Sequence, residues 1–300
     1  KQRVLQEARP LFQQIEETAE SNTLKVLNAM REVRLSEAHF TTTSGYAYDD
    51  IGRQKLDELY AMVFEAEKAL VRTQFVSGTH ALATVLFGLL RPGDTLLSVT
   101  GVPYDTMQTV IGYAHPSPGS LKEFGISYDE VPLQDGRVDL TALSQKVTPK
   151  TKVALIQRSR GYSLRPPLTM ENISQICRTI KAIQPHCVCF VDNCYGEFVN
   201  LAEPITAGAD IMAGSLIKNP GGGLAPTGGY IAGKAALVEL AAYRLTAPGM
   251  GDELGASLAN NRLLFAGLFL APHVVSQAIK GAIFAAGVFA RLGYPVSPAP

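Results

Sequence analysis

The sequence predicts an α/β protein built on a mostly parallel β-sheet that is covered by helices. From about residue 70 onward, short apolar runs typical of buried strands alternate with helical stretches. The strand-like runs are ALVRTQFVS, TLLSV, ISYDEVPL, KVALIQ, VCFVDN and DIMAGS. HALATVLFGLL, DTMQTVIGYA, DLTALSQKV and ENISQICRTIKAI lie between them. This alternation is typical of βαβ units. TGGYIAG predicts one further strand, which could be antiparallel, and ALVELAAYRLTA returns to helix.

The N-terminal residues predict helices and one polar loop. Apolar residues recur at helical spacing over the first 15 residues, and a second helix is expected over Asn22 to Val33. The polar loop TTTSGYAYDDIG separates these from a third helix predicted over Gln54 to Val71. Such a loop is a poor core element, so we expect it to reach into a binding site.

The C-terminal residues predict the start of another domain. The pattern from Gly251 is helical and apolar to about Arg291, and the chain then ends in GYPVSPAP. We therefore expect an N-terminal helical segment over 1–45, a large α/β domain over 46–250, and the beginning of a truncated C-terminal small domain over 251–300.

Composition excludes few classes of protein but favours a soluble enzyme-sized domain. The 300 residues are 46% hydrophobic and 18% charged, with a formal net charge of zero. Nothing here favours nucleic acid or an acidic membrane as a partner. The charged amphipathic N-terminus does not resemble a signal peptide, and polar residues interrupt the longest apolar stretch, Leu263 to Ala290. We expect a cytoplasmic protein.

Four cysteines, Cys177, Cys187, Cys189 and Cys194, lie close together in the sequence. Their spacing lacks the paired CxxC pattern of common metal sites. We expect reduced cysteines packed near the core and no metal.

Two stretches predict groups that could hold a phosphate and a flat ring. In FVSGTHALATVLFGLL, Ser77, Gly78 and Thr79 open a helix directly after a strand, where free amides and the helix dipole suit a phosphate. Ser77 could equally be a simple N-cap. In TGVPYDTM, Tyr104 follows the strand TLLSV and could stack on a planar ligand or pack in the core.

Two further strand ends carry an acid and an amine. Asp192 follows the strand VCFV and could be a cap, a metal ligand or the partner of a cationic ring nitrogen. Lys218 lies in GSLIKNPGGG, with Ser215 three places before it. A lysine in apolar surroundings has a lowered pKa and can attack a carbonyl. The glycines would let the backbone pass close to a flat ligand. A solvated surface lysine is the alternative.

Together these groups match a site for pyridoxal 5′-phosphate (PLP): a helix N-terminus for the phosphate, a stacking ring, an aspartate for the pyridinium nitrogen and a lysine for the Schiff base. Their order along the chain resembles the fold-type I PLP-dependent enzymes, and more narrowly the Cys/Met metabolism group. GSLIKNPGGG and QRSRGYSLRP resemble most the methionine gamma-lyase-like family of aluminium resistance proteins. The resemblance covers about residues 35 to 255 and implies a three-layer sandwich with about seven strands.

The resemblance also implies roles for particular residues. Lys218 would carry the cofactor and move substrate protons, Asp192 would pair with the ring nitrogen, and Tyr104 would stack and assist the leaving group. Ser77, Gly78, Thr79 and Ser215 would hold the phosphate. Tyr48 and Arg53 would contact the phosphate of a neighbouring subunit in a homodimer or homotetramer, although their spacing is longer than in the lyases.

The resemblance departs at two points. Ile217 stands where the lyases carry threonine, and the arginine that grips the substrate carboxylate belongs to a C-terminal domain. Arg158 and Arg160 lie near another strand end and could serve instead.

The resulting hypothesis is a PLP-dependent carbon–sulfur lyase that acts on a methionine-, cystathionine- or cysteine-type amino acid by β- or γ-elimination. The alternatives are an aminotransferase and a catalytically silent PLP-binding stress or metal-resistance protein. A nucleotide-binding α/β protein has no support, because the sequence contains neither a P-loop nor GxGxxG.

Overall fold

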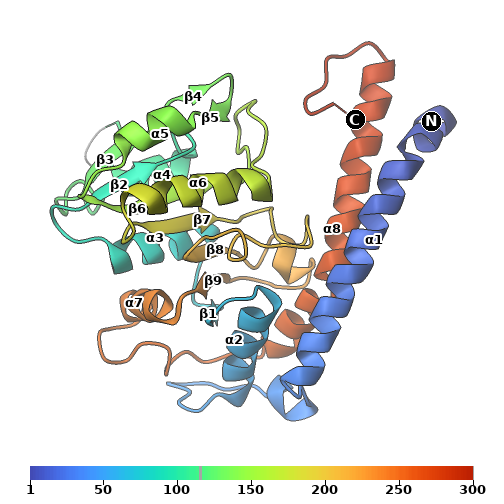
Figure 1. Cartoon of the computed structure of the whole chain (residues 1–300). Helices are drawn as coiled ribbons and strands as arrows, with labels where there is room; N and C mark the ends of the chain where they lie inside the picture. The colour runs from blue at the N-terminus through green and yellow to red at the C-terminus, as the bar shows by residue number, and fades with distance from the viewer. Residues whose placement is uncertain (115–116, 300) are drawn as a thin grey trace.

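The computed structural model describes residues 1–114 and 117–299 and has a seven-stranded sheet at its centre (Figure 1). The sheet order is β1-β9-β8-β7-β6-β2-β3. These strands are β1 (Lys68–Arg72), β2 (Thr95–Ser98), β3 (Ser127–Glu130), β6 (Thr151–Gln157), β7 (Val188–Asp192), β8 (Ile211–Ser215) and β9 (Gly229–Gly233). From β3 to β8 all pairings are parallel, and β9 is antiparallel to both of its neighbours. The predicted mostly parallel sheet is confirmed.

Helices cover both faces of the sheet and complete three layers. One apolar core joins the sheet to α2 (Ile51–Val63), α5 (Leu140–Lys146), α6 (Met170–Ile183) and α8 (Asn261–Arg291). A second core joins the opposite face to α3 (Gly78–Leu89), α4 (Asp105–Ile111) and α7 (Ala235–Leu245). The hairpin β4 (Leu133–Gln134) and β5 (Arg137–Val138) and the short helices η1 (Glu37–Phe40) and η2 (Asn219–Gly221) lie in the connections.

The first helix, α1 (Gln2–Glu32), is continuous, whereas the sequence predicted two helices. Polar residues between the predicted segments do not break it, because hydroxyls of Thr18, Ser21 and Thr23 donate to backbone carbonyls one turn earlier at 2.7–2.9 Å. The polar stretch therefore remains helical.

The helix predicted over Gln54 to Val71 was too long. Helix α2 ends at Val63, and Glu65 takes a left-handed conformation with φ of 55°. Leu70 and Val71 instead pair with Ile231 and Tyr230 of β9. Their apolar character fits either element, so tertiary pairing decides the outcome.

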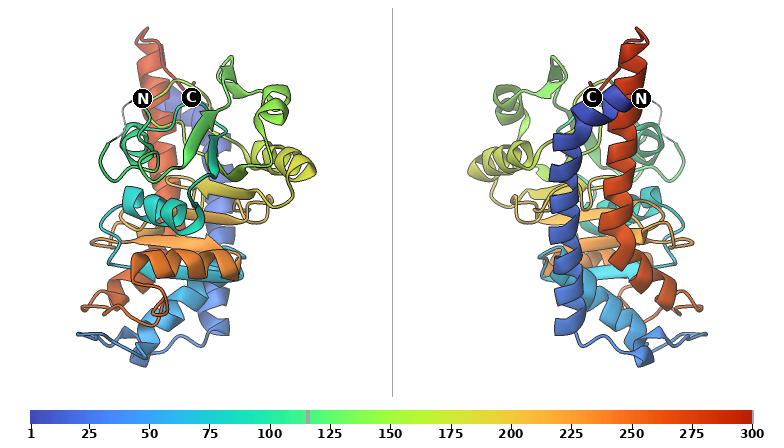
Figure 2. Two further views of the ribbon diagram at one scale, coloured as in Figure 1. Left: turned by 90° about the vertical axis from the view of Figure 1, so that its left-hand side faces the viewer. Right: turned by 90° about the vertical axis from the view of Figure 1, so that its right-hand side faces the viewer.

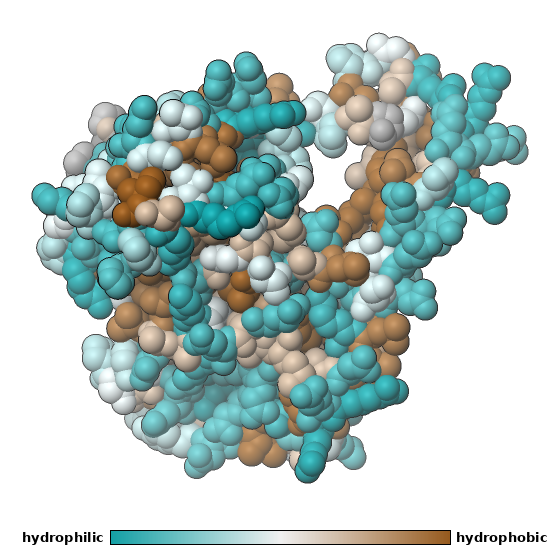
Figure 3. All heavy atoms as spheres, viewed as in Figure 1, coloured by the Kyte–Doolittle hydropathy of each residue, from teal (hydrophilic) through white to brown (hydrophobic). Residues whose placement is uncertain are grey.

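Helices α1 and α8 come from opposite ends of the described chain and run side by side (Figure 2). Lys280 of α8 forms an ion pair with Glu16 of α1 at 2.9 Å. In Figure 3 the outer side of α1 is hydrophilic, and hydrophobic residues run along α8 beside it. The two helices form one long pair. The N-terminal half of α8 packs against the sheet, with Leu264 and Leu268 in the shared core.

Among the described residues, α8 alone is long and apolar enough to cross a bilayer by length and composition, with a mean hydropathy of 1.4 over its most apolar window. The sequence predicted no such stretch, because polar residues such as Lys280 interrupt it. In the structure 44% of that window is buried.

Candidate functional site

A cavity of about 370 Å³ lies at the carboxyl ends of β6, β7 and β8. It brings together three of the predicted residues, Tyr104, Asp192 and Lys218. Open α/β sheets bind ligands at this edge, because the loops that follow parallel strands converge there. The acid and the amine singled out in the sequence therefore share one pocket.

Asp192 is the last residue of β7 and is buried. One carboxylate oxygen accepts a hydrogen bond from the backbone N–H of Cys194 at 3.1 Å. Burial raises the pKa of Asp192 above its ordinary value, although the Cys194 amide and the positive charge of Lys218 oppose that rise. A buried carboxylate of this kind is stabilised by a cation placed beside it.

Lys218 follows β8 and is half-buried in the cavity wall. Its Nζ lies 4.3 Å from the centre of the Tyr195 ring, in a cation–π contact. Burial alone would lower the pKa of Lys218, but Cys194, Tyr195 and Asp192 outweigh it and raise the pKa. The lowered pKa predicted for Lys218 is therefore wrong, because these neighbours are distant in the sequence and act only in the folded chain.

The predicted phosphate-binding residues meet at the N-terminus of α3. A Cβ added to Gly78 would lie 3.2 Å from Cβ of Ser215 and 3.4 Å from Sγ of Cys194, so only glycine leaves this space open. The Oγ of Ser215 is buried and has no hydrogen-bond partner among the described residues. A buried hydroxyl without a partner at a helix N-terminus can donate a hydrogen bond to a bound anion.

Ser77 and Thr79 have partners of their own at this helix start. Ser77 is the N-cap of α3, and its hydroxyl accepts from the amide of His80 at 3.1 Å. The hydroxyl of Thr79 lies 2.8 Å from the Tyr104 hydroxyl. This contact links the phosphate end of the site to the ring end.

The residues present fit PLP. The cradle of Gly78 and Ser215 suits a phosphate, and buried Asp192 suits a cationic ring nitrogen. Lys218 supplies an amine in the same cavity. Each group of the cofactor thus has a side chain of complementary chemistry.

The glycine loop after Lys218 makes close contacts with other parts of the chain. A Cβ on Gly221 would collide with the carbonyl oxygen of Leu216, and one on Gly222 with the carbonyl oxygen of Gly267 in α8. These glycines permit close packing against the protein's own backbone. An added Cβ on Gly223 would meet no atom within 4 Å, and approach of this loop to a flat ligand stays a prediction.

Tyr48 and Arg53 lie away from this cavity. Tyr48 is exposed beside Tyr46, with 6.1 Å between ring centres. Arg53 is buried and donates to the carbonyls of Ala47, Glu253 and Gly255 at 2.8–2.9 Å. Contact of either residue with the phosphate of a neighbouring subunit stays a prediction.

Gln157 and Tyr195 are among the residues that line the cavity and that the sequence did not single out. Gln157 ends β6 and accepts from the backbone N–H of Tyr104 at 3.1 Å, so it fixes the position of the ring. Tyr195 covers the Lys218 amine from a strained backbone with φ of 67°. Cys194 is buried as expected but also lines the cavity. Gln157 could have been found, because it ends a strand beside Asp192.

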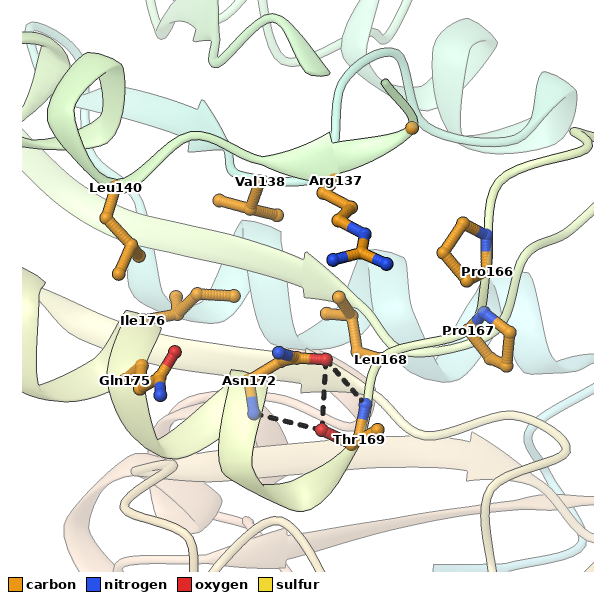
Figure 4. Close-up of a pocket in the computed structure, with 11 residues that line it drawn as sticks. Arg137, Val138, Leu140, Pro166, Pro167, Leu168, Thr169, Asn172, Gln175 and Ile176 are labelled. Atoms are coloured by element: carbon orange, nitrogen blue, oxygen red, sulfur yellow. Dashed lines mark hydrogen bonds between the residues drawn. The ribbon is translucent and has the colours of Figure 1, made fainter. Parts of the chain in front are cut away.

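A second cavity of about 370 Å³ lies between β5 and the start of α6 (Figure 4). Arg137 points into it above Leu168 and Asn172, and Pro166 and Pro167 close one end. Arg137 is the one ionisable side chain among its described lining residues. This cavity offers no nucleophile and no acid–base pair, unlike the Lys218 cavity.

The fold has a known class. The chain shares its fold with the PLP-dependent protein YhfS of Escherichia coli, with a TM-score of 0.65 and 20% identity over 89% of this chain and 68% of that chain. A sheet of this order with a lysine and an aspartate at its carboxyl edge is the fold-type I architecture of PLP-dependent enzymes.

More similar proteins define the family. A family model described as methionine gamma-lyase matches residues 1–300. The uncharacterized protein YnbB of Bacillus subtilis is 51% identical over 96% of this chain and 69% of that protein. L-methionine gamma-lyase of Pseudomonas putida is 28% identical over 72% of this chain and 49% of that enzyme.

A solved structure from Listeria monocytogenes, described as a candidate cystathionine beta-lyase involved in aluminum resistance, has a TM-score of 0.98 and 54% identity. The match covers 99% of this chain and 74% of that chain. The chain belongs to the methionine gamma-lyase family. The family and these neighbours indicate a PLP-dependent carbon–sulfur lyase, and PLP is the cofactor.

Proposed function

We propose that this chain breaks the carbon–sulfur bond of a methionine-, cystathionine- or cysteine-type amino acid by β- or γ-elimination, with PLP carried on Lys218. The observation that supports it most is the placement of Lys218 and Asp192 in one cavity beside Tyr104. The names of the Pseudomonas and Listeria proteins favour the same substrate class.

The residues would hold the cofactor at three points. Ser77, Gly78, Thr79 and Ser215 bind the phosphate at the N-terminus of α3, and Asp192 keeps a proton on the ring nitrogen. Bound PLP supplies an electron-poor ring that accepts the electron pair left when a substrate C–H bond breaks. Tyr104 lies against that ring, fixed by Gln157.

Lys218 and Tyr104 then divide the proton transfers. Once the substrate's amino group has replaced it on the cofactor, the released Lys218 amine would take the proton from the substrate α-carbon, and in γ-elimination also a β proton. Burial raises the pKa of Tyr104, so its hydroxyl keeps its proton at neutral pH. That hydroxyl can protonate the sulfur as the carbon–sulfur bond breaks, and Thr79 at 2.8 Å orients it.

We also propose that a second copy of this chain covers the mouth of the site, giving a homodimer or homotetramer. Three large apolar side chains are strongly exposed: Val76, beside Ser77 in the sequence, at 78%, Tyr162, which lines the cavity, at 91%, and Leu164, two residues after it, at 82%. Exposed apolar groups of this kind are typical of interfaces. The exposed Tyr48 of one copy would then serve the phosphate site of the other, and sedimentation should show no stable monomer.

An absorbance spectrum tests the proposed function. The purified protein with PLP should absorb in the visible, and borohydride reduction followed by peptide mapping should locate the cofactor on Lys218. Lys218→Ala should lose both the bound chromophore and turnover, whereas Lys150→Ala, which changes an exposed lysine, should keep both. Turnover retained by Lys218→Ala would contradict the proposal.

The products separate elimination from the alternatives. A lyase releases ammonia, a thiol and pyruvate or 2-oxobutyrate without a second substrate. An aminotransferase requires an oxo-acid acceptor. A silent PLP-binding protein would show the chromophore on Lys218 but turn over none of the sulfur amino acids.

A further inference from the structure

The cavity between β5 and the start of α6 is separate from the candidate active site (Figure 4). It has a volume of about 370 Å³, and none of its described lining residues also lines the Lys218 cavity. Cavities of this size hold small molecules. The chemistry of the lining side chains therefore indicates what a ligand here would have to be.

The floor of this cavity is apolar. Its apolar side chains belong to the core or pack half-buried against the edge of the core: Ile176, Val138, Leu140 and Leu168. Contact of such a floor with water is unfavourable in proportion to its area, and an apolar ligand that covers the floor removes this contact. A ligand that fits the floor therefore has an apolar body.

Arg137 supplies the charge of the cavity. Its side chain points into the cavity, and its guanidinium forms no hydrogen bond or ion pair with another described residue (Figure 4). Arg72, by contrast, pairs with Asp57 at 2.8 Å. No acidic side chain is among the described lining residues. A planar guanidinium without a partner matches the two oxygens of a carboxylate.

The backbone that carries Arg137 is held firmly. Asp135 and Gly136 form the two-residue turn between β4 and β5, with φ of 50° and 73°, as in a tight hairpin. A Cβ added to Gly136 would lie 3.4 Å from Cβ of Arg165, so the turn sits directly on that residue. Arg165 is itself fixed by donation to the carbonyl oxygen of Gln157 at 2.8 Å. A held backbone reduces the ordering that binding at Arg137 requires.

Asn172 offers a second donor in the same cavity. Its side-chain oxygen accepts from the backbone N–H of Thr169 at 3.1 Å and from the Thr169 hydroxyl at 2.9 Å, which fixes the orientation of the amide (Figure 4). Its Nδ2 forms no hydrogen bond with another described residue. Arg137 and Asn172 thus both present N–H groups, and a negatively charged acceptor satisfies both.

We propose that this cavity binds one small carboxylate with an apolar body of about four to eight carbon atoms, a size that suits its volume. The carboxylate lies against the Arg137 guanidinium and Nδ2 of Asn172, and the apolar body covers the floor formed around Ile176. An inorganic anion would satisfy the donors but leave the floor in contact with water. An amine would be repelled by Arg137.

Isothermal titration calorimetry of the PLP-loaded full chain tests the proposal. The probes are acetate, butanoate and hexanoate, with hexanamide as the neutral analogue of hexanoate. Hexanoate should bind with one molecule per chain, and each added methylene should raise the affinity about 3- to 4-fold, because it is buried on the apolar floor. Hexanamide should bind about 10-fold more weakly than hexanoate, since it lacks the charge.

Variants of the cavity separate the two parts of the ligand. Arg137→Gln should weaken hexanoate about 10- to 100-fold and leave hexanamide unchanged. Arg137→Lys keeps the charge but loses the planar fork, so the affinity should recover only in part. Val138→Thr keeps the shape of the floor but adds a hydroxyl, and it should weaken hexanoate more than acetate. Arg178→Gln, which changes an exposed arginine of α6 outside this lining, should bind every probe as the parent does.

Three results would overturn the proposal. Hexanoate affinity that is the same in Arg137→Gln and the parent would place the carboxylate elsewhere, for example in the Lys218 cavity. Equal affinities for acetate and hexanoate would mean an adventitious ion only, because the floor would not contribute. No saturable binding of hexanoate would mean that the cavity takes no such ligand. A chain that binds hexanoate through Arg137 but takes no PLP on Lys218 would contradict the proposed function alone.

Discussion

Glu197 is a fully buried carboxyl group close to the candidate site. One of its oxygens accepts from the Tyr230 hydroxyl at 2.7 Å, and the other has no partner among the described residues. Burial raises the pKa of Glu197 to about 8. It therefore carries a proton at neutral pH and adds no negative charge beside the nearby buried carboxyl group of Glu203.

The proton on Glu197 predicts a pH dependence of stability. Between the ordinary pKa of 4.5 and about 8, the folded chain binds a proton that the unfolded chain releases, so this group's contribution to the free energy of unfolding falls as pH rises. The slope is about 1.4 kcal/mol per pH unit. Glu197→Gln should remove this slope. Between pH 6 and pH 9 the free energy of unfolding should therefore fall less in Glu197→Gln than in the parent. Urea unfolding at both pH values measures it.

Glu20→Gln, which changes an exposed glutamate of α1, serves as the control and should keep the pH slope of the parent. If Glu197→Gln also keeps that slope, the carboxyl group is ionised in the folded state and the assignment fails.

The unpartnered Ser215 hydroxyl predicts a separation of stability from cofactor affinity. Ser215→Ala removes a buried hydroxyl that makes no hydrogen bond, so the free energy of unfolding without PLP should change little. The affinity for PLP should fall about 10-fold, because one charge-assisted hydrogen bond to the phosphate is lost. Thermal unfolding and PLP titration measure the two quantities.

Ser144→Ala, on the exposed side of α5, is the control and should alter neither quantity. If Ser215→Ala binds PLP as tightly as the parent does, Ser215 does not belong to the phosphate site.

The loop that follows Lys218 predicts an order of stability among glycine variants. Gly221→Ala would force a methyl group onto the carbonyl of Leu216, although its φ is not left-handed. Gly223→Ala meets no atom within 4 Å and suffers only its φ of 75°. We expect Gly223→Ala to cost about 1 kcal/mol and Gly221→Ala clearly more. Denaturant unfolding gives both values, and a smaller cost at Gly221 would show that the loop rearranges freely.

The strands that end at the site were predictable from sequence, because a short run of apolar residues indicates each buried strand. VCFVD and DIMAGS are buried parallel strands, and parallel strands place Asp192 and the residues after Ser215 at the same edge. The contacts that set the chemistry were not predictable in the same way. Gly221 against Leu216 and Tyr195 over Lys218 depend on how loops fold back, which no periodicity encodes.

The same limit explains the errors in element bounds. Leu70 and Val71 continue the apolar pattern of α2, yet they pair with β9, a strand more than a hundred residues later in the chain. The joining of residues 2–32 into one helix likewise depends on contact along its length with α8. Long-range pairing decided both cases, and a single sequence shows only the local preference.

Helices α1 and α8 pack together, and α8 also contacts the edge of the sheet that carries Lys218. Helix α8 packs against η2, the turn directly after Lys218, and Gly267 of α8 contacts Gly222. Leu268 of α8 is fully buried in the core that also contains Tyr60 and Tyr230. Loosening α8 should therefore destabilise the sheet domain and the Lys218 loop together.

Leu268→Ala tests this coupling. It should lower the free energy of unfolding by about 2–5 kcal/mol, the usual cost of a cavity in a core. It should also weaken PLP binding, since η2 positions Lys218. Phe269→Ala, one residue further and 39% exposed, should cost much less and leave PLP affinity unchanged. The chain lacks tryptophan, so circular dichroism should follow unfolding. If Leu268→Ala loses stability while PLP affinity stays that of the parent, α8 supports the fold but not the site.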